Sequence, residues 1–227
     1  MSLFEKHQAS LERAVKAIQE RTFYAHYPEH PKAYGKEAPV AGQAAFDAQV
    51  NAPYTELLQT GNTTSIGEEN SPYWNKALGI TYPSATVNTL MDNATTAFKS
   101  WRKTSVQERA GLLIESLDKV ATRFHEIAYA TMHTTGQSYV MSFQASGPHA
   151  ADRALETVAM AYSELTRFPT TVHWQKPMGR FALSLNKTFQ PIPKGVGLVI
   201  GCSTFPTWNS VPGLYASLMT GNTAVLK

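Results

Sequence analysis

The sequence has only one cysteine, Cys202, among its 227 residues. No disulfide can therefore form within the chain, and nothing indicates an oxidising compartment. Long apolar runs are also missing: no uninterrupted stretch approaches the roughly 18 residues that span a bilayer, and charges interrupt the N-terminal segment where a signal peptide would have its apolar core. These absences argue against a membrane protein and a secreted one, so we expect a cytoplasmic protein.

The chain also lacks a large excess of charge of either sign. Its 20 basic and 17 acidic side chains leave a net charge of +3, which is too small to indicate nucleic acid or an anionic membrane as a partner. Hydrophobic residues make up 43% of the sequence and charged residues 16%, as is usual for a globular protein. The length allows one sizeable domain, or one domain and part of another.

Helical periodicity dominates the first 165 residues. Apolar residues at spacings of three and four predict helices, and clusters of glycine, proline and small polar residues predict the breaks between them. Ser105 and Glu108 fit a capping box at the start of a long helix, and Gly136 is a plausible stop. We predict helices over 2–21, 42–50, about 90–101, 106–135 and about 151–165, an extended stretch over 22–31, and no regular period over 61–83.

The period changes after residue 170. Alternating residues over 181–186 predict a half-buried strand, and the continuous apolar run over 196–200 predicts a strand buried on both faces. A helix capped by Asn209 or Ser210, with Pro212 near its first turn, precedes a second strand over 223–227. This order is a βαβ unit, the building block of a parallel sheet.

A single βαβ unit does not cover both faces of its sheet, so the apolar surface of Val199 and Val225 requires more strands and helices. We therefore expect that the polypeptide is incomplete. The predicted fold class is α/β, with an N-terminal helical layer followed by the start of a parallel-sheet nucleotide-binding domain. The predicted divisions are an N-terminal extension over 1–84, a helical layer with a β-hairpin over 85–190, and the βαβ unit over 191–227.

Ligands of an open α/β sheet bind beyond the carboxyl ends of its strands. The sequence places Gly201–Pro206 after the first strand and Lys227 at the end of the second. Small residues in the first loop let the backbone approach a ligand, and the following helix N-terminus favours a phosphate. Since the G-x-G-x-x-G fingerprint is absent, this pattern alone is a weak indication.

Four ordered motifs resemble the aldehyde dehydrogenase family. They are Ala97–Trp101 (A-F-x-x-W), Thr104–Ala110 (T-x-x-E-R-A), Pro193–Pro206 and Leu218–Lys227, and together they cover about 90–227. Three upstream segments are similar to the N-terminal extension of the phenylacetic-acid degradation protein PaaN branch: Tyr27–Glu29, Lys32–Gly35 and Gly42–Phe46. That branch implies aromatic catabolism and a ring-cleavage semialdehyde as substrate.

The resemblance implies a coenzyme, NAD or NADP, and roles for individual residues. Lys227 matches the lysine that holds the adenosine ribose hydroxyls. Cys202, Ser203 and Thr204 match the family's Pro-Trp-Asn, which lines the coenzyme. The family's asparagine donates to the oxyanion, so Thr204 is the candidate oxyanion donor, although a hydroxyl has a shorter reach and a different geometry.

The family enzyme forms a thiohemiacetal with its aldehyde, passes hydride to the nicotinamide and releases the acid from a thioester. Its nucleophilic cysteine and general-base glutamate match no residue up to Lys227, so the resemblance implies that this chain alone is inactive. It also implies an aldehyde or semialdehyde substrate, free or CoA-linked, and a homo-oligomer for the full-length protein. Neither nucleic acid nor a membrane is expected as a partner.

Other interpretations remain open. Cys202 precedes a helix N-terminus and is a candidate thiol nucleophile, although an inert cysteine at a coenzyme-lining position is favoured. A hydrolase using Ser203 or Cys202 lacks the second glycine of a nucleophile elbow and has no aspartate or histidine after it. A non-catalytic module that binds a nucleotide, or a partner through its sheet edge, is a further alternative.

No metal site is predicted. His26 and His30 are four residues apart, but the prolines around them argue against a helix that would bring their rings together. Glu115 and Asp118 lie on the polar face of their predicted helix, and we expect them to be solvated charges.

Overall fold

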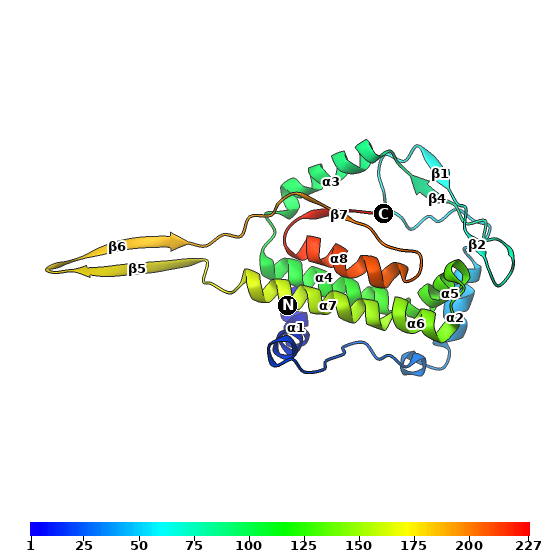
Figure 1. Cartoon of the computed structure of the whole chain (residues 1–227), viewed down its shortest axis with the longest axis horizontal. Coiled ribbons are helices and arrows are strands. Elements are labelled where there is room, and N and C mark those ends of the chain that lie inside the picture. The colour runs from blue at the N-terminus through cyan, green and yellow to red at the C-terminus, as the bar shows by residue number, and fades with distance from the viewer.

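The structure is a computed structural model that describes residues 1–227. Figure 1 shows a body of stacked helices from which a long two-stranded ribbon projects, with the last strand lying against the helices near the C-terminus. None of the helices combines the length and the apolar character that a bilayer crossing requires.

Helix α1 (Leu3–Glu20) confirms the first predicted helix. Ser2 and Glu5 form a capping box, in which the serine hydroxyl accepts from the Glu5 amide at 3.2 Å and the glutamate accepts from the Ser2 amide at 2.7 Å. The helix ends at Arg21, in the left-handed conformation with φ 56°. After a 3-10 turn (Pro31–Tyr34), helix α2 (Ala38–Asp47) begins four residues before the predicted start.

Residues 61–83, for which the sequence gives no period, contain two small antiparallel strand pairs. They are too short to display an alternating pattern, so sequence reasoning missed them. Strand β1 (Thr64–Ile66) pairs with β4 (Tyr82–Ser84), and β2 (Asn70–Ser71) pairs with β3 (Lys76–Ala77).

The prediction of one long helix over 106–135 is wrong. Helix α3 (Val87–Trp101) is followed by α4 (Val106–Ala121) and α5 (Phe124–Thr135), with a break at Thr122 and Arg123. Apolar spacing continues across this break because two non-helical residues do not disturb a three-and-four pattern. The packing partners change, however: α4 contacts α1 and α7, whereas α5 contacts α2 and α6. Gly136, with φ 78°, ends α5 as predicted.

Helix α6 (Tyr139–Ser146) was not predicted, and Gly147 separates it from α7 (Pro148–Leu165). The main core lies where α1, α4, α5, α6, α7 and α8 meet. Its largest fully buried side chains include Leu11, Ile114, Phe124, Phe143 and Leu155. A small second cluster under the N-terminal strands contains Phe46, Leu78 and Ile80.

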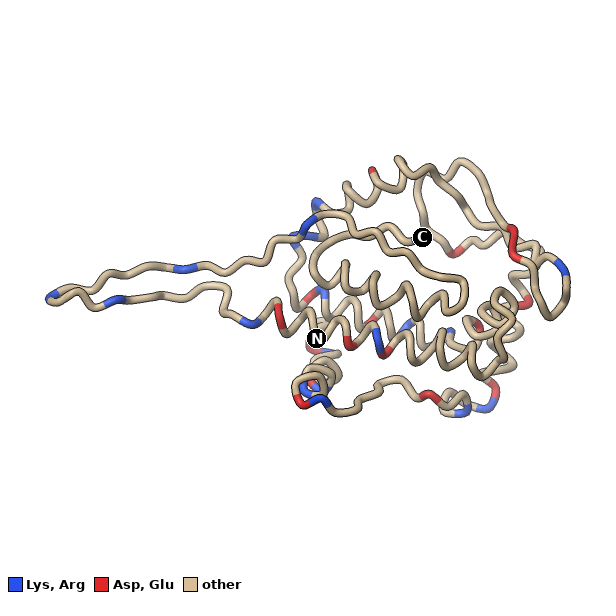
Figure 2. Tube along the Cα trace, viewed as in Figure 1, with Lys and Arg blue, Asp and Glu red and all other residues tan.

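Strands β5 (Thr171–Met178) and β6 (Phe181–Thr188) form the projecting hairpin in Figure 1. The predicted half-buried strand over 181–186 is therefore a strand, but it is exposed along its whole length. Alternation predicts a strand with one apolar face, and nothing in this chain packs against that face. Figure 2 shows only basic charges along the hairpin.

The predicted βαβ unit is confirmed: β7 (Val196–Val199) and β8 (Thr223–Leu226) are parallel and joined by α8 (Pro206–Met219). Helix α8 begins at Pro206, so the predicted cap at Asn209 or Ser210 is wrong and Pro212 lies inside the helix. Proline is favoured in a first turn because its fixed φ suits a helix and its missing amide needs no partner there.

The prediction that β7 is buried on both faces is wrong for this chain. Val199 is 8% exposed, whereas Leu198 is 68% and Ile200 is 63% exposed. Helix α8 covers one face of the two strands and α3 contacts both of them. The uncovered apolar side chains are thus Leu198, Ile200 and Leu226, and not the pair of valines that the sequence indicated.

Candidate functional site

The candidate site lies at the carboxyl ends of the two parallel strands. The Gly201 amide donates to the Lys227 carbonyl at 2.8 Å, and the Lys227 amide donates to the Val199 carbonyl at 2.9 Å. These two bonds place the loop after β7 beside the residue after β8. The structure therefore brings Cys202, Ser203 and Thr204 to the same edge of the sheet as Lys227, 23 or more positions later in the sequence.

Side chains at this edge face solvent. Cys202, Ser203, Thr204 and Lys227 are all exposed, and the loop leads directly into the first turn of α8. The first amides of a helix have no partner within it and carry a partial positive charge, so they favour an anionic group. A side chain at Gly201 would bring its Cβ within 3.3 Å of the Ser210 Cβ, so the backbone approaches the helix closely there.

Two contacts from the helical layer fix this loop. The Gln137 amide nitrogen donates to the Thr204 carbonyl, and the Thr207 hydroxyl donates to the Ser146 carbonyl at 2.9 Å. Gln137 lies between α5 and α6 and belongs to none of the motifs, so sequence reasoning missed it. No pattern in the sequence pairs a residue with a carbonyl 67 positions away.

The C-terminal end of α8 is held by hydrogen bonds from the helical layer, from residues of the motifs that resemble the family. The Trp101 indole donates to the Leu218 carbonyl at 3.0 Å, and Arg109 Nε donates to the Met219 carbonyl at 3.0 Å. Arg109 Nη1 also donates to the Thr104 carbonyl at 2.5 Å. Asn222 then accepts from the Lys194 amide at 2.7 Å, at the start of β7. These motif residues thus position the βαβ unit and do not reach the candidate site.

The loop backbone acts on the Cys202 thiol. The backbone amides of Phe205 and Thr204 lower the pKa of the Cys202 thiol below its usual range. No histidine or carboxylate forms a hydrogen bond with Cys202 or Ser203, so a general base for a hydrolase is missing among the described contacts. The geometry therefore gives the hydrolase interpretation no support.

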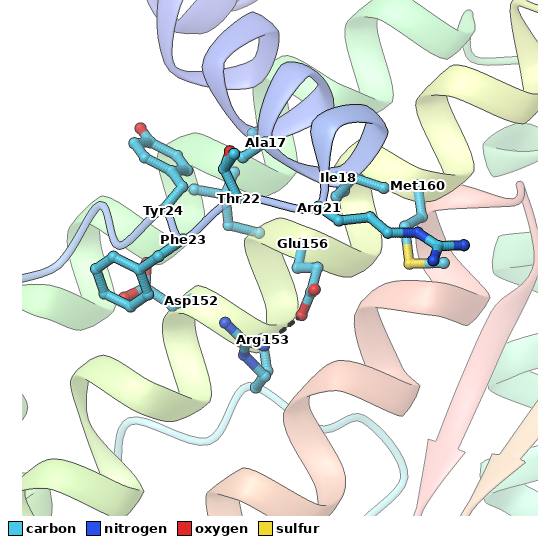
Figure 3. A pocket seen from close by; sticks show the side chains of 12 residues that line it. Ala17, Ile18, Arg21, Thr22, Phe23, Tyr24, Asp152, Arg153, Glu156 and Met160 are labelled. Atoms are coloured by element: carbon cyan, nitrogen blue, oxygen red, sulfur yellow. Dashed lines mark ion pairs between the residues drawn. The ribbon is translucent and has the colours of Figure 1, made fainter.

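Several cavities lie away from this edge. One of about 390 Å³ opens between the C-terminal end of α1 and helix α7. Figure 3 shows Arg21 reaching from α1 toward Met160 above an ion pair between Arg153 and Glu156, whose charged atoms are 2.7 Å apart. None of the predicted site residues lines this cavity.

The expectation that Glu115 and Asp118 are solvated charges is wrong. Glu115 accepts hydrogen bonds from Lys6 and lies 2.7 Å from His7 Nε2, while Asp118 accepts from the Tyr27 hydroxyl at 2.9 Å. A signal was present in the sequence: His7 follows Phe4 and precedes Leu11 at helical spacing, inside the apolar stripe of α1.

Comparison with known proteins agrees with the motifs. The sequence profile of the aldehyde dehydrogenase family matches residues 68–227. The curated protein 4-trimethylaminobutyraldehyde dehydrogenase B of Danio rerio is 29% identical over 151 residues, which are 63% of this chain and 26% of that protein. The crystal structure of an NAD-dependent aldehyde dehydrogenase from Burkholderia multivorans is 43% identical, with a TM-score of 0.94 over 100% of this chain and 41% of that one.

A more distant structure, 1-pyrroline-5-carboxylate dehydrogenase of Thermus thermophilus, is 15% identical with a TM-score of 0.64 and covers 90% of this chain and 39% of that chain. That likeness concerns the fold alone. This chain therefore spans well under half the length of each of these relatives.

Proposed function

The chain belongs to the aldehyde dehydrogenase family, and we propose that the edge formed by Cys202–Thr204 and Lys227 holds the coenzyme of an NAD(P)-dependent aldehyde dehydrogenase. The proposal rests on one observation above all, the pair of backbone hydrogen bonds that join Gly201 and Lys227 across the two strands. They set a loop of small residues that leads into a helix N-terminus beside the backbone of Lys227.

The residues at this edge fit a dinucleotide. The first amides of α8 suit its pyrophosphate, and the exposed Lys227 ammonium suits the two hydroxyls of a ribose. The bound coenzyme supplies the hydride acceptor of the reaction. Thr204 offers a hydroxyl that donates to an oxygen developing negative charge, while Gln137 fixes the Thr204 backbone.

We expect no aldehyde oxidation by these residues alone. The only thiol is Cys202, and it occupies a position in the coenzyme loop with no general base bonded to it. Purified chain incubated with NAD⁺ or NADP⁺ and a panel of short-chain and aromatic aldehydes should give no increase in the absorbance of reduced coenzyme above a protein-free blank. Steady turnover would contradict this expectation.

Coenzyme binding tests the site itself. We expect saturable binding of NAD⁺ or NADP⁺ by calorimetric titration, weakened roughly 10- to 100-fold by Lys227→Met, since each hydrogen bond from a charged donor contributes about 1.5–3 kcal/mol. Lys194→Met is the matched control, because Lys194 is an exposed lysine at the opposite end of the same strand pair. Equal losses in both variants, or no binding by the parent chain, would refute the assignment.

The substrate proposal is a semialdehyde of aromatic catabolism, free or CoA-linked. It is supported by the resemblance of Tyr27–Glu29, Lys32–Gly35 and Gly42–Phe46 to the phenylacetic-acid degradation branch. In the fold, Tyr34 packs edge-on against the buried Phe124. The test is kcat/KM for ring-derived semialdehydes against straight-chain aldehydes, in an active protein that contains these 227 residues; equal values contradict the branch.

We also propose that the β5–β6 hairpin supports a homo-oligomer. Several of its apolar side chains are exposed: Phe181 is 66%, Leu183 44% and Leu185 45% exposed. A two-stranded ribbon is marginally stable by itself and offers unpaired edges to another chain. Sedimentation of the same active protein should show a smaller species when Leu183 and Leu185 are both replaced by serine, and an unchanged mass would contradict the role of the hairpin.

A further inference from the structure

The turn between β2 and β3, residues 72–75, lies against the link between α5 and α6. The Tyr73 hydroxyl donates to the Gln137 carbonyl at 2.7 Å and lies 3.4 Å from the Gly136 carbonyl. Pro72 approaches the same link, because a Cβ added at Gly136 would lie 3.3 Å from Pro72 Cγ. The turn therefore fixes the backbone from which the Gln137 side chain extends.

His133 on α5 fastens this turn independently of Tyr73. The His133 ring is 5% exposed and contacts two aromatic rings, with centroid distances of 5.0 Å to Phe46 and 4.1 Å to Trp74. Its Nδ1 lies 2.7 Å from the hydroxyl of Ser71, which accepts from the Trp74 amide at 3.1 Å. Because these contacts do not involve the Tyr73 hydroxyl, the turn should keep its place when that hydroxyl is removed.

Gln137 carries the constraint to the loop after β7. Its amide nitrogen donates to the Thr204 carbonyl. The C=O and N–H groups of a trans peptide point in opposite directions, so a Thr204 carbonyl held by the helical layer turns the Phe205 amide the other way. That amide lowers the pKa of the Cys202 thiol, and it immediately precedes the start of α8. Gln137 thus directs an amide that meets an anionic group.

The other end of the Gln137 amide is not explained by stability. Gln137 Oε1 is buried and accepts no hydrogen bond. A buried acceptor without a donor costs free energy, and an apolar side chain of similar shape would fill the same space without that cost. The glutamine therefore contributes its donor to the loop at the expense of the fold.

We propose that Tyr73 and Gln137 are positioning residues for the coenzyme loop. The Tyr73 hydroxyl holds the backbone at Gln137, and the Gln137 amide orients the peptide between Thr204 and Phe205 for an anionic group of the coenzyme. The coenzyme part of this inference rests on the proposed function. A turn of the N-terminal extension, which does not itself belong to the coenzyme edge, thereby takes part in coenzyme binding.

Cys202 reports the orientation of the loop without any coenzyme. The rate of its alkylation by iodoacetamide is measured across pH in the parent chain and in the variants. Gln137→Met should raise the pH midpoint by about 0.5–1 pH unit, because the loop amides are no longer held toward the thiolate. Tyr73→Phe should raise it in the same direction. The double variant should match Gln137→Met, since Tyr73 acts through Gln137.

Coenzyme affinity and stability complete the test. Calorimetric titration should show NAD⁺ binding weakened roughly 3- to 10-fold in Gln137→Met and in Tyr73→Phe, as expected for one lost hydrogen bond. The urea midpoint of Gln137→Met should equal that of the parent chain or exceed it, because methionine removes the unpaired buried oxygen. A purely structural role would instead lower the urea midpoint and leave the alkylation midpoint of the folded chain unchanged.

Two matched controls remove the same groups elsewhere. The Tyr54 hydroxyl donates to Glu56, and the Gln49 amide donates to Glu126, so neither side chain bonds to the loop. Tyr54→Phe and Gln49→Met should leave the alkylation midpoint and the NAD⁺ affinity at the values of the parent chain.

The proposal is overturned if Gln137→Met leaves the alkylation midpoint unchanged, if Tyr73→Phe shifts it further in the double variant, or if the controls shift it as much. Its coenzyme part is overturned if the midpoint moves while NAD⁺ affinity stays constant. If the parent chain binds no NAD⁺, the proposed function fails, and the alkylation series still decides whether these two residues position the loop.

Discussion

Replacing Arg109 by methionine should weaken the attachment of the βαβ unit to the helical layer and so lower the stability of the chain. The Arg109 side chain is 5% exposed and has no carboxylate partner, and burial lowers the pKa of its guanidinium. It is stabilised instead by the carbonyls of Met219 and Thr104. Met219 lies in the last turn of α8, where the helix dipole favours a cation.

The magnitude follows from these two bonds. A hydrogen bond from a charged donor contributes about 1.5–3 kcal/mol, and methionine leaves both carbonyls without it while filling most of the volume. Part of this loss is offset because a buried guanidinium no longer has to be desolvated. We expect Arg109→Met to lower the free energy of unfolding by about 3 kcal/mol, and Arg109→Lys by about 1–2 kcal/mol because lysine lacks the planar fork.

Urea unfolding followed by circular dichroism measures this difference. With an m value near 2 kcal/mol/M, Arg109→Met should lower the urea midpoint by about 1.5 M. Arg102→Met is the control, because Arg102 lies on the surface over the Phe98 ring and its loss should change the midpoint little. The account of Arg109 is refuted if both variants unfold within about 0.3 M of the parent chain.

Three further predictions concern the pH dependence of stability, helix contact and the loop thiol. Burial lowers the pKa of His133 below 6.5, so its contribution to stability should be full above that pH and fall as the pH drops below it, where the unfolded chain binds the proton more readily. The urea midpoint at pH 7.5 and at pH 5.5, compared between the parent chain and His133→Gln, measures this contribution. An equal fall of the midpoint in the variant would contradict the role of His133. Gly111→Ala should destabilise the chain by about 1–2 kcal/mol, because the new Cβ would lie 2.5 Å from the Phe4 amide nitrogen. Gly213→Ala, whose new Cβ meets a valine methyl at 3.2 Å, should not destabilise it. Equal unfolding temperatures for the two variants would refute the close contact between Gly111 and α1. The rate of Cys202 alkylation by iodoacetamide should have its pH midpoint below that of a free cysteine peptide, and a higher midpoint would contradict the loop geometry.

The βαβ unit, and the edge at which its two strands end together, could be predicted because local pattern and chain order determine them. A continuous apolar run, a helix and a second run imply parallel strands, and parallel strands put Gly201 and Lys227 at one edge. The family motifs then located the same loop independently. The start of α8 could not be placed in the same way, since Asn209 and Ser210 are good caps by residue type, and only the backbone shows that Pro206 already begins the helix.

Contacts between segments far apart in the chain were not predictable from periodicity. Gln137 reaches Thr204 across 67 positions, and His7 reaches Glu115 across 108. Burial likewise depends on which other elements pack against a segment. The alternation of apolar and polar residues over 181–186 correctly predicts a strand, yet the strand is exposed because no second layer covers it. Asp118 on α4 accepts from Tyr27 in the segment after α1, although by its place on the helix Asp118 looks like an ordinary solvated charge.

The central claim, that the loop after β7 and the residue after β8 form one coenzyme site, is tested most directly by nuclear magnetic resonance of ¹⁵N-labelled chain titrated with NAD⁺. We predict saturable shifts of the amide resonances of Gly201, Cys202, Thr204 and Lys227, with those of Tyr24 and His26 unchanged. Shifts confined to the cavity between α1 and α7, or no shift at the strand ends, would contradict the account.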